Sequence, residues 1–190
     1  MPVSIVTQPA FEPVTLDEAK AHLRVTHDAE DDLITALITA AREAAENYTH
    51  RALCEKTLEY YCDAFPCQIV LPQPPVQSVT SVKYIDRDGI EQTLDAAEYQ
   101  THIQNEPALI VEAYGKTWPT TRDELNAVRV RYVVGYASAA DVPGPVKAAL
   151  LLMIGHLYEN REDSIVGAAI SELPFGSRCL LNPYRMLRFL

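Results

Sequence analysis

The chain has 190 residues, of which 48% are hydrophobic and 22% are charged, and its formal net charge is −10. This balance is typical of a globular protein with a sizeable core and argues against a disordered chain. The acidic surplus repels phosphate backbones, which argues against DNA binding driven by charge neutralisation. No apolar run approaches the roughly 20 residues that span a bilayer, and the first residues do not resemble a signal peptide.

The N-terminal part predicts two helices. The first, in VTLDEAKAHLRV, opens with a capping box in which Thr15 and Glu18 each bond the other's backbone amide. The second begins near Asp28, whose carboxylate suits an N-cap. Its apolar stripe is rich in alanine, so a packing partner comes close. The predicted stripe is Leu33, Ile34, Leu37, Ile38, Ala41, Ala44, Ala45 and Tyr48, and the wet face is Asp32, Thr35, Thr39, Arg42, Glu43 and Glu46.

From about residue 55 to residue 136 the apolar period changes to two, which is typical of strands. The clearest strand is VRVRYVVGY, which places Val128, Val130, Tyr132, Val134 and Tyr136 on one face and Arg129 and Arg131 on the other. We expect further strands in TLEYYCDAF, QIVL, SVTSVKYI and ALIVEAY. The segment DRDG predicts a hairpin turn, and PQPPV predicts a connection.

The segment DVPGPVKAALLLMIGHLYENRED predicts a long helix with Pro145 in its first turn. This helix carries two apolar stripes and therefore needs two covers, one of which we expect to be the alanine-rich stripe. The stripes are Val146, Ala149, Leu150, Met153 and Leu157, and Leu151, Ile154 and Tyr158. The last segment is broken by Pro174, Gly176 and Pro183, so it predicts only short helical turns and extended pieces.

Together these elements predict an α+β fold, in which a helical bundle from the N- and C-terminal segments carries an inserted antiparallel β subdomain. We expect residues 1–54 to form the N-terminal helical part and residues 55–137 the β subdomain. Residues 138–190 are then the C-terminal helix and a docking tail, which packs with residues 1–54.

Motifs for catalysis are missing: the sequence has no Gly-rich phosphate loop, HExxH, GxSxG elbow or CxxC pair. His156 and Glu159 lie three residues apart, but a closed metal site needs about four ligands. We therefore predict no catalytic residue, cofactor or metal. Arg129 and Arg131 form either a basic stripe or a solvated face paired with carboxylates. Reduced, small buried residues are expected at Cys54, Cys62, Cys67 and Cys179.

The tail CLLNPYRMLRFL combines apolar residues with arginines and a tyrosine, which are types that anchor protein interfaces. Two alternatives stay open from these residues alone. Either the tail packs on its own helices, or it docks another protein.

One segment of the helical N-terminal part resembles the N-terminal signature of the head–tail connector (adaptor or head-completion) proteins of long-tailed double-stranded DNA phages and prophages. The segment is VTLDEAKAHLRVTHDAEDDLITALITAAREAAENYTHRAL, from Val14 to Leu53. The β segment resembles the longer members of that family through LPQPPVQSVTSVKYIDRDG and VRVRYVVGY. The likeness continues in VPGPVKAALLLMIGHLYENRED and LPFGSRCLLNPYRM. Matching positions include Leu16, Lys20, Leu23, Arg24, Asp32, Leu33, Ala41, Arg42, Glu46, Tyr48 and Thr49.

The resemblance implies a structural virion protein without catalysis or cofactor, which forms a ring of about twelve subunits beneath the portal protein. Such a ring joins the portal to the tail completion proteins and extends a channel through which DNA passes without specific binding. The implied location is the head–tail junction of the virion, and the host cytoplasm during assembly, with no membrane. We expect a partner interface at Tyr158, Arg161, Arg178, Tyr184, Arg185 and Arg188, and an acidic channel wall at Asp31, Asp32, Glu43 and Glu46.

Two other classes remain as alternatives. A tail terminator or other phage tail-assembly adaptor shares the size and acidity, but such proteins are usually dominated by β-structure with one helix, so the two-helix start favours the connector. A small hydrolase or deaminase needs a convergent set of histidine, cysteine and acidic residues, whereas the histidines here are scattered along the chain.

Overall fold

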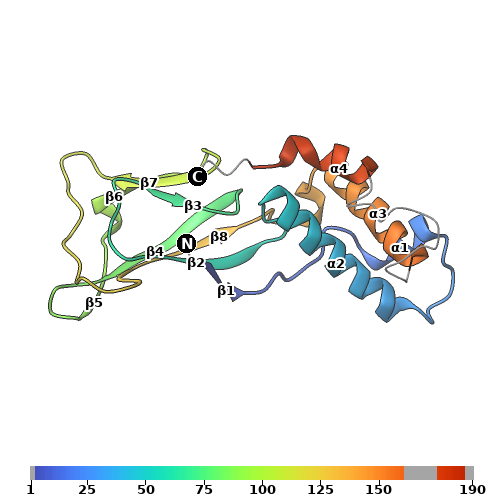
Figure 1. Cartoon of the computed structure of the whole chain (residues 1–190), viewed down its shortest axis with the longest axis horizontal. Coiled ribbons are helices and arrows are strands. Elements are labelled where there is room, and N and C mark those ends of the chain that lie inside the picture. The colour runs from blue at the N-terminus through green and yellow to red at the C-terminus, as the bar shows by residue number, and fades with distance from the viewer. Residues whose placement is uncertain (1–2, 161–174, 187–190) are drawn as a thin grey trace. The chain divides into compact units, whose positions relative to one another are not determined.

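The computed structural model describes residues 3–160 and 175–186 of the chain. They divide into two compact units, each built from two separate stretches of sequence (Figure 1). The first unit combines Met1–Ala10 with Cys54–Tyr136, and the second combines Phe11–Leu53 with Ala137–Leu190. The first unit contains the strands and the second contains the α-helices.

Two antiparallel sheets make up the first unit, one of five strands in the order β1-β2-β8-β4-β5 and one of three in the order β3-β7-β6. A short 3-10 turn, Ala96–Glu98, leads into β6. The strands are β1 Val3–Thr7, β2 Lys56–Cys62, β3 Ile69–Leu71, β4 Val76–Ile85, β5 Glu91–Thr93, β6 Tyr99–His102, β7 Ala108–Glu112 and β8 Val128–Val134.

Buried and more exposed side chains alternate along β8, and this alternation shows which face of the large sheet packs into the core. Its residues Val128, Val130, Tyr132 and Val134 are buried and Arg131 is exposed, as the period of two predicted. The Tyr132 hydroxyl donates a hydrogen bond of 3.2 Å to the carbonyl of Pro72, just after β3. The small sheet contributes further buried residues: Ile69, Leu71, Ala108 and Ile110.

Each of the five predicted strand segments overlaps a strand of the structure, namely β2, β3, β4, β7 and β8. The predicted hairpin is confirmed: the turn after β4 has Gly89 at φ 83°, and β4 pairs with β5. Strands β1, β5 and β6 were not predicted. All three lie at sheet edges, where short strands need few buried residues, so their alternation is weak.

The second unit contains the helices α1 Leu16–Leu23, α2 Asp31–Thr49, α3 Gly144–Glu159 and α4 Phe175–Leu181, with 3-10 turns at Ala139–Asp141 and Asn182–Tyr184. The capping box is confirmed, because the Glu18 amide donates to the Thr15 hydroxyl at 3.2 Å and the Thr15 amide to the Glu18 carboxylate at 2.8 Å. The prediction that Asp28 is the N-cap of the second helix was wrong, since Glu30 is the N-cap of α2. Asp28 lies 2.6 Å from the Lys20 ammonium instead.

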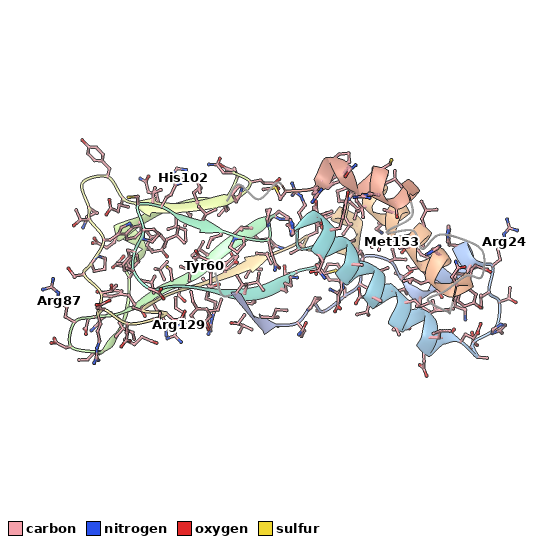
Figure 2. All side chains as sticks on the ribbon, in the orientation of Figure 1. Arg24, Tyr60, Arg87, His102, Arg129 and Met153 are labelled. Carbon is pink, nitrogen blue, oxygen red and sulfur yellow. The ribbon has the colours of Figure 1, made fainter. Side chains whose placement is uncertain are left out.

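Helix α3 packs against α1, α2 and α4. Its buried residues are Val146, Ala149, Leu150, Met153 and Ile154, and Figure 2 labels Met153 among the helices. On α2, Ala41 and Ala45 are fully buried, and α2 is in contact with α3 as expected. Leu33 and Leu157, both predicted as buried, are each 37% exposed. They lie in the first turn of α2 and the last turn of α3, where fewer neighbours reach them.

The α+β class is confirmed, with N- and C-terminal helices in contact and antiparallel sheets from the central segment. Within the described ranges, every helix is too short or too polar to cross a bilayer.

Gly135, which follows β8, provides a test of the first unit's packing. Its φ is +93°, and a Cβ there would lie 2.1 Å from the carbonyl oxygen of Cys54. We expect Gly135→Ala to lower the free energy of unfolding by about 3 kcal/mol or more, because backbone must move. Urea unfolding followed by fluorescence of Trp118, the one tryptophan of the chain, measures it.

Gly115→Ala is the matched control, since Gly115 also has a positive φ of +75° but nothing within 4 Å of an added Cβ. Its expected cost is about 1 kcal/mol, from backbone conformation alone. Equal effects of the two substitutions would contradict the role assigned to Gly135.

Candidate functional site

The C-terminal segment is held on the end of α2 by the side chain of Tyr48. The Tyr48 hydroxyl donates to the side-chain oxygen Oδ1 of Asn182 at 2.5 Å and accepts from the Arg178 Nε at 3.4 Å. The guanidinium carbons of Arg178 and Arg185 lie 5.9 and 5.2 Å from the centre of the ring. Cation–π contacts at exposed sites contribute about 0.5–1 kcal/mol each. We call Tyr48, Arg178, Asn182 and Arg185 the tail anchor.

Backbone groups of the same segment are bonded beside the tail anchor. The Arg51 Nε donates to the Tyr184 carbonyl at 2.5 Å, and the Met186 amide donates to the Thr49 carbonyl at 2.8 Å. The Leu181 side chain is fully buried. As far as Met186, therefore, the tail packs on its own helices, while Arg178 and Arg185 stay exposed.

The predicted interface residues lie at two different places. Tyr158, on the last turn of α3, is half-buried and its hydroxyl bonds the Glu30 carboxylate at the start of α2. Tyr48 lies near the other end of α2, and at about 1.5 Å per residue the two ends are on the order of 27 Å apart. Tyr158 is therefore separate from the tail anchor. Arg161 and Arg188 lie outside the described residues.

Of the acidic residues predicted for a channel wall, two lie at the start of α2. Asp31 is half-buried, and its carboxylate lies 2.7 Å from the Lys20 ammonium, which also bonds Asp28 at 2.6 Å. The hydrogen bonds that the Lys20 ammonium donates to these two carboxylates raise the pKa of Lys20, and the bond accepted from Lys20 lowers the pKa of Asp28. Asp32 points to solvent and is exposed.

The other two acidic residues surround Arg42, which was predicted on the wet face but is only 6% exposed. Its guanidinium bonds the Glu12 carboxylate at 2.8 Å and the Glu46 carboxylate at 3.3 Å, and lies 3.6 Å from Glu43. A buried cation requires such pairing, and Glu12 comes from a distant stretch that no helical pattern could reveal. Glu46 is nearly buried and also accepts a hydrogen bond of 2.7 Å from the Leu53 amide, whereas Glu43 is exposed.

On the polar face of the large sheet, the arginines of β8 are paired with carboxylates. Arg131 donates to Glu59 at 2.7 Å, and Arg129, labelled in Figure 2, contacts Glu91. Burial alone would raise the pKa of Glu59, but hydrogen bonds from Tyr61 and Arg131 outweigh it and lower that pKa. The face is thus a solvated, charge-paired surface and not a basic stripe.

Reactive groups are not assembled in the described part of the chain. Across residues 3–160 and 175–186, no three His, Cys, Asp or Glu side chains are grouped to hold a metal ion. All four cysteines are free, but Cys67 and Cys179 are exposed, so the expectation of buried cysteines holds for Cys54 and not for these two. Burial, with Asp63 nearby, raises the pKa of Cys62 to about 11, which makes its thiol a poor nucleophile at neutral pH.

The chain belongs to the phage gp6-like head-tail connector protein family, whose model matches residues 13–108. The resemblance read from the sequence is therefore confirmed. As a member of this family, the protein is a structural, non-enzymatic component of the virion at the head–tail junction.

Solved structures extend this likeness to the whole chain. In the neck of an empty gene transfer agent (GTA) particle computed with C6 symmetry, a chain is 27% identical with a TM-score of 0.82, and the match covers 100% of this chain and 98% of that one. A chain in the virion of the native GTA particle is 26% identical with a TM-score of 0.81 and the same coverage, 100% and 98%.

A chain in the neck of the native GTA particle computed with C12 symmetry is 25% identical, with a TM-score of 0.74 and coverage of 100% and 98%. Among curated proteins, none matches the chain.

The tail anchor can be tested through its hydroxyl. Tyr48→Phe keeps the ring but removes the bonds to Asn182 and Arg178. We expect it to cost about 1 kcal/mol of stability and to speed hydrogen exchange of the Met186 amide several-fold, because the segment detaches more often. Tyr114→Phe, at a fully exposed side chain, is the control and should change neither. Unaltered exchange at Met186 in Tyr48→Phe would show that the hydroxyl does not hold the tail.

Proposed function

We propose that this protein forms a ring of about twelve subunits that joins the portal to the tail and extends the DNA channel. The observation that carries the proposal is the match over 100% of this chain to a protein in a GTA neck computed with C12 symmetry. The family match supports the same role, because a head–tail connector lies between these two parts of the virion. It also favours this role over a tail terminator.

We assign the portal contact to the C-terminal tail. The tail anchor orders the chain as far as Met186, and the residues LRFL follow. Ordering the segment before binding reduces the conformational entropy lost on docking. The exposed guanidinium groups of Arg178 and Arg185 suit carboxylates on a partner, which arginine binds in a bidentate manner.

We assign the channel-facing charge to Asp32 and Glu43, the exposed members of the four acidic residues. A negative wall repels the DNA backbone, so the genome slides past without binding. Asp31 and Glu46 add to the local charge, although each is paired with a cation of its own unit.

Light scattering on a size-exclusion run, with and without the matching portal protein at micromolar concentration, tests the ring. We expect a mass near that of about twelve subunits, or a portal complex with a fixed number of copies, because the portal raises the local concentration of subunits. A monomer that ignores the portal would overturn the proposed function.

A truncation after Met186 tests the tail. It removes residues 187–190 and leaves every bond of the tail anchor in place. We expect portal binding to weaken at least tenfold, measured by co-elution or calorimetry, with an unchanged circular dichroism spectrum. Tyr114→Ala, distant in sequence and fully exposed, is the control that should bind normally. Portal binding at full strength by the truncated chain would show that residues 187–190 take no part in the contact.

The double variant Asp32→Asn, Glu43→Gln tests the channel wall. Neutral side chains remove the repulsion, so we expect DNA to leave the particle several-fold more slowly or incompletely, as measured by genome ejection from assembled particles. The control is Asp88→Asn, at an exposed acid of the first unit. Ejection at the normal rate in the double variant would contradict the assignment.

A further inference from the structure

Strand β1 is an open edge of the five-stranded sheet. Among the described strands it pairs with β2 alone, through Val3, Ser4, Ile5 and Thr7. Successive residues of a strand face opposite sides, and Ser4 and Ile5 are both exposed, so neither face of β1 is covered. Ile5 and Val6 are 51% and 44% exposed, respectively.

The composition of β1 does not protect this edge. Natural edge strands are usually guarded against pairing with another chain by lysine, other charges or proline. The sequence VSIVT contains none of these. One guarding feature is present, a register shift between Ile5 and Thr7, and it limits regular pairing to the first part of the strand. An uncharged, exposed edge of this kind is suited to main-chain pairing with another strand.

The opposite edge of the same sheet is β5, which is paired with β4 alone among the described strands. Its residues Glu91 and Thr93 are exposed, and the adjoining hairpin turn presents Ile90 with 59% of its surface exposed. The large sheet therefore ends in two different open strands, with β2, β8 and β4 between them.

We propose that β1 of one subunit pairs with β5 of the next, so that the five-stranded sheets continue from subunit to subunit. The inference rests on the proposed ring, in which each subunit must offer two different surfaces to its neighbours. Two edges of one sheet meet that requirement, because each is a row of unpaired backbone groups that faces away from the other. Pairing of β1 with β1 would instead close a two-fold dimer and stop growth.

Ile5→Lys tests the edge. Ile5 is exposed, so the subunit keeps its fold, but a charged edge strand resists pairing. We expect the ring population at micromolar concentration to fall at least tenfold by light scattering, with unchanged circular dichroism. The matched control is Tyr114→Lys, which places the same charge at a fully exposed residue just after β7 of the small sheet and should assemble normally.

Cross-linking tests the pairing itself. In a background with Cys67→Ser and Cys179→Ser, the double variant Ser4→Cys, Thr93→Cys is treated with a short bis-maleimide. We expect a ladder of oligomers on a denaturing gel. The control pair Ser4→Cys, Thr101→Cys places the second thiol on the exposed β6 edge of the small sheet and should give no ladder.

Each outcome decides one question. If the wild-type chain forms no ring even with the portal, the proposed function fails. If rings form normally with Ile5→Lys and no ladder appears, the strand pairing fails while the ring stands. If Ile5→Lys keeps the ring but loses portal binding, β1 pairs with the portal, which overturns the assignment to a second copy. Dimers from Ser4→Cys alone would indicate two-fold pairing and overturn it as well.

Discussion

The close contact between α2 and α3 is the constraint on which the second unit depends. Ala41 and Ala45 are fully buried on α2, and such small side chains let two helices approach closely. Helix α2 precedes the β insertion Cys54–Tyr136 and α3 follows it. Their contact therefore brings together the two stretches of sequence that form the second unit. Loop-closure entropy grows only slowly with the length of the loop, so a helical pair can hold a long insertion at little extra cost.

Ion pairing within each unit explains how an acidic chain stays compact. Arg42 neutralises carboxylates that would otherwise repel one another inside the helical unit, and Arg131 does the same for Glu59 on the sheet. The uncompensated charge is left on exposed side chains such as Asp32 and Glu43. A large net charge of one sign keeps free subunits apart. Contacts between copies then favour uncharged elements, and β1 is one.

The tail anchor takes part both in the packing of the helices and in the proposed contact with the portal. Tyr48 is at once the last stripe residue of α2 and the support on which Arg178 and Arg185 rest. One aromatic ring can do both because its apolar body packs while its hydroxyl bonds Asn182. The two alternatives for the tail were therefore not exclusive: a segment that packs on its own helices can still present charged groups outward.

The sequence by itself determined what depends on near neighbours: the capping box of Thr15 and Glu18, the alternation along β8, the helical stripes and the family signature. These signals repeat at fixed spacing, so a short window contains them. Only the tertiary structure decided that Arg42 is buried and paired with Glu12, that Tyr48 bonds the C-terminal tail, and which strands lie at the sheet edges. The first two depend on groups far apart in the chain, and an edge strand is defined by having a neighbouring strand on one side only. Neither property produces a repeating pattern in a short window of sequence.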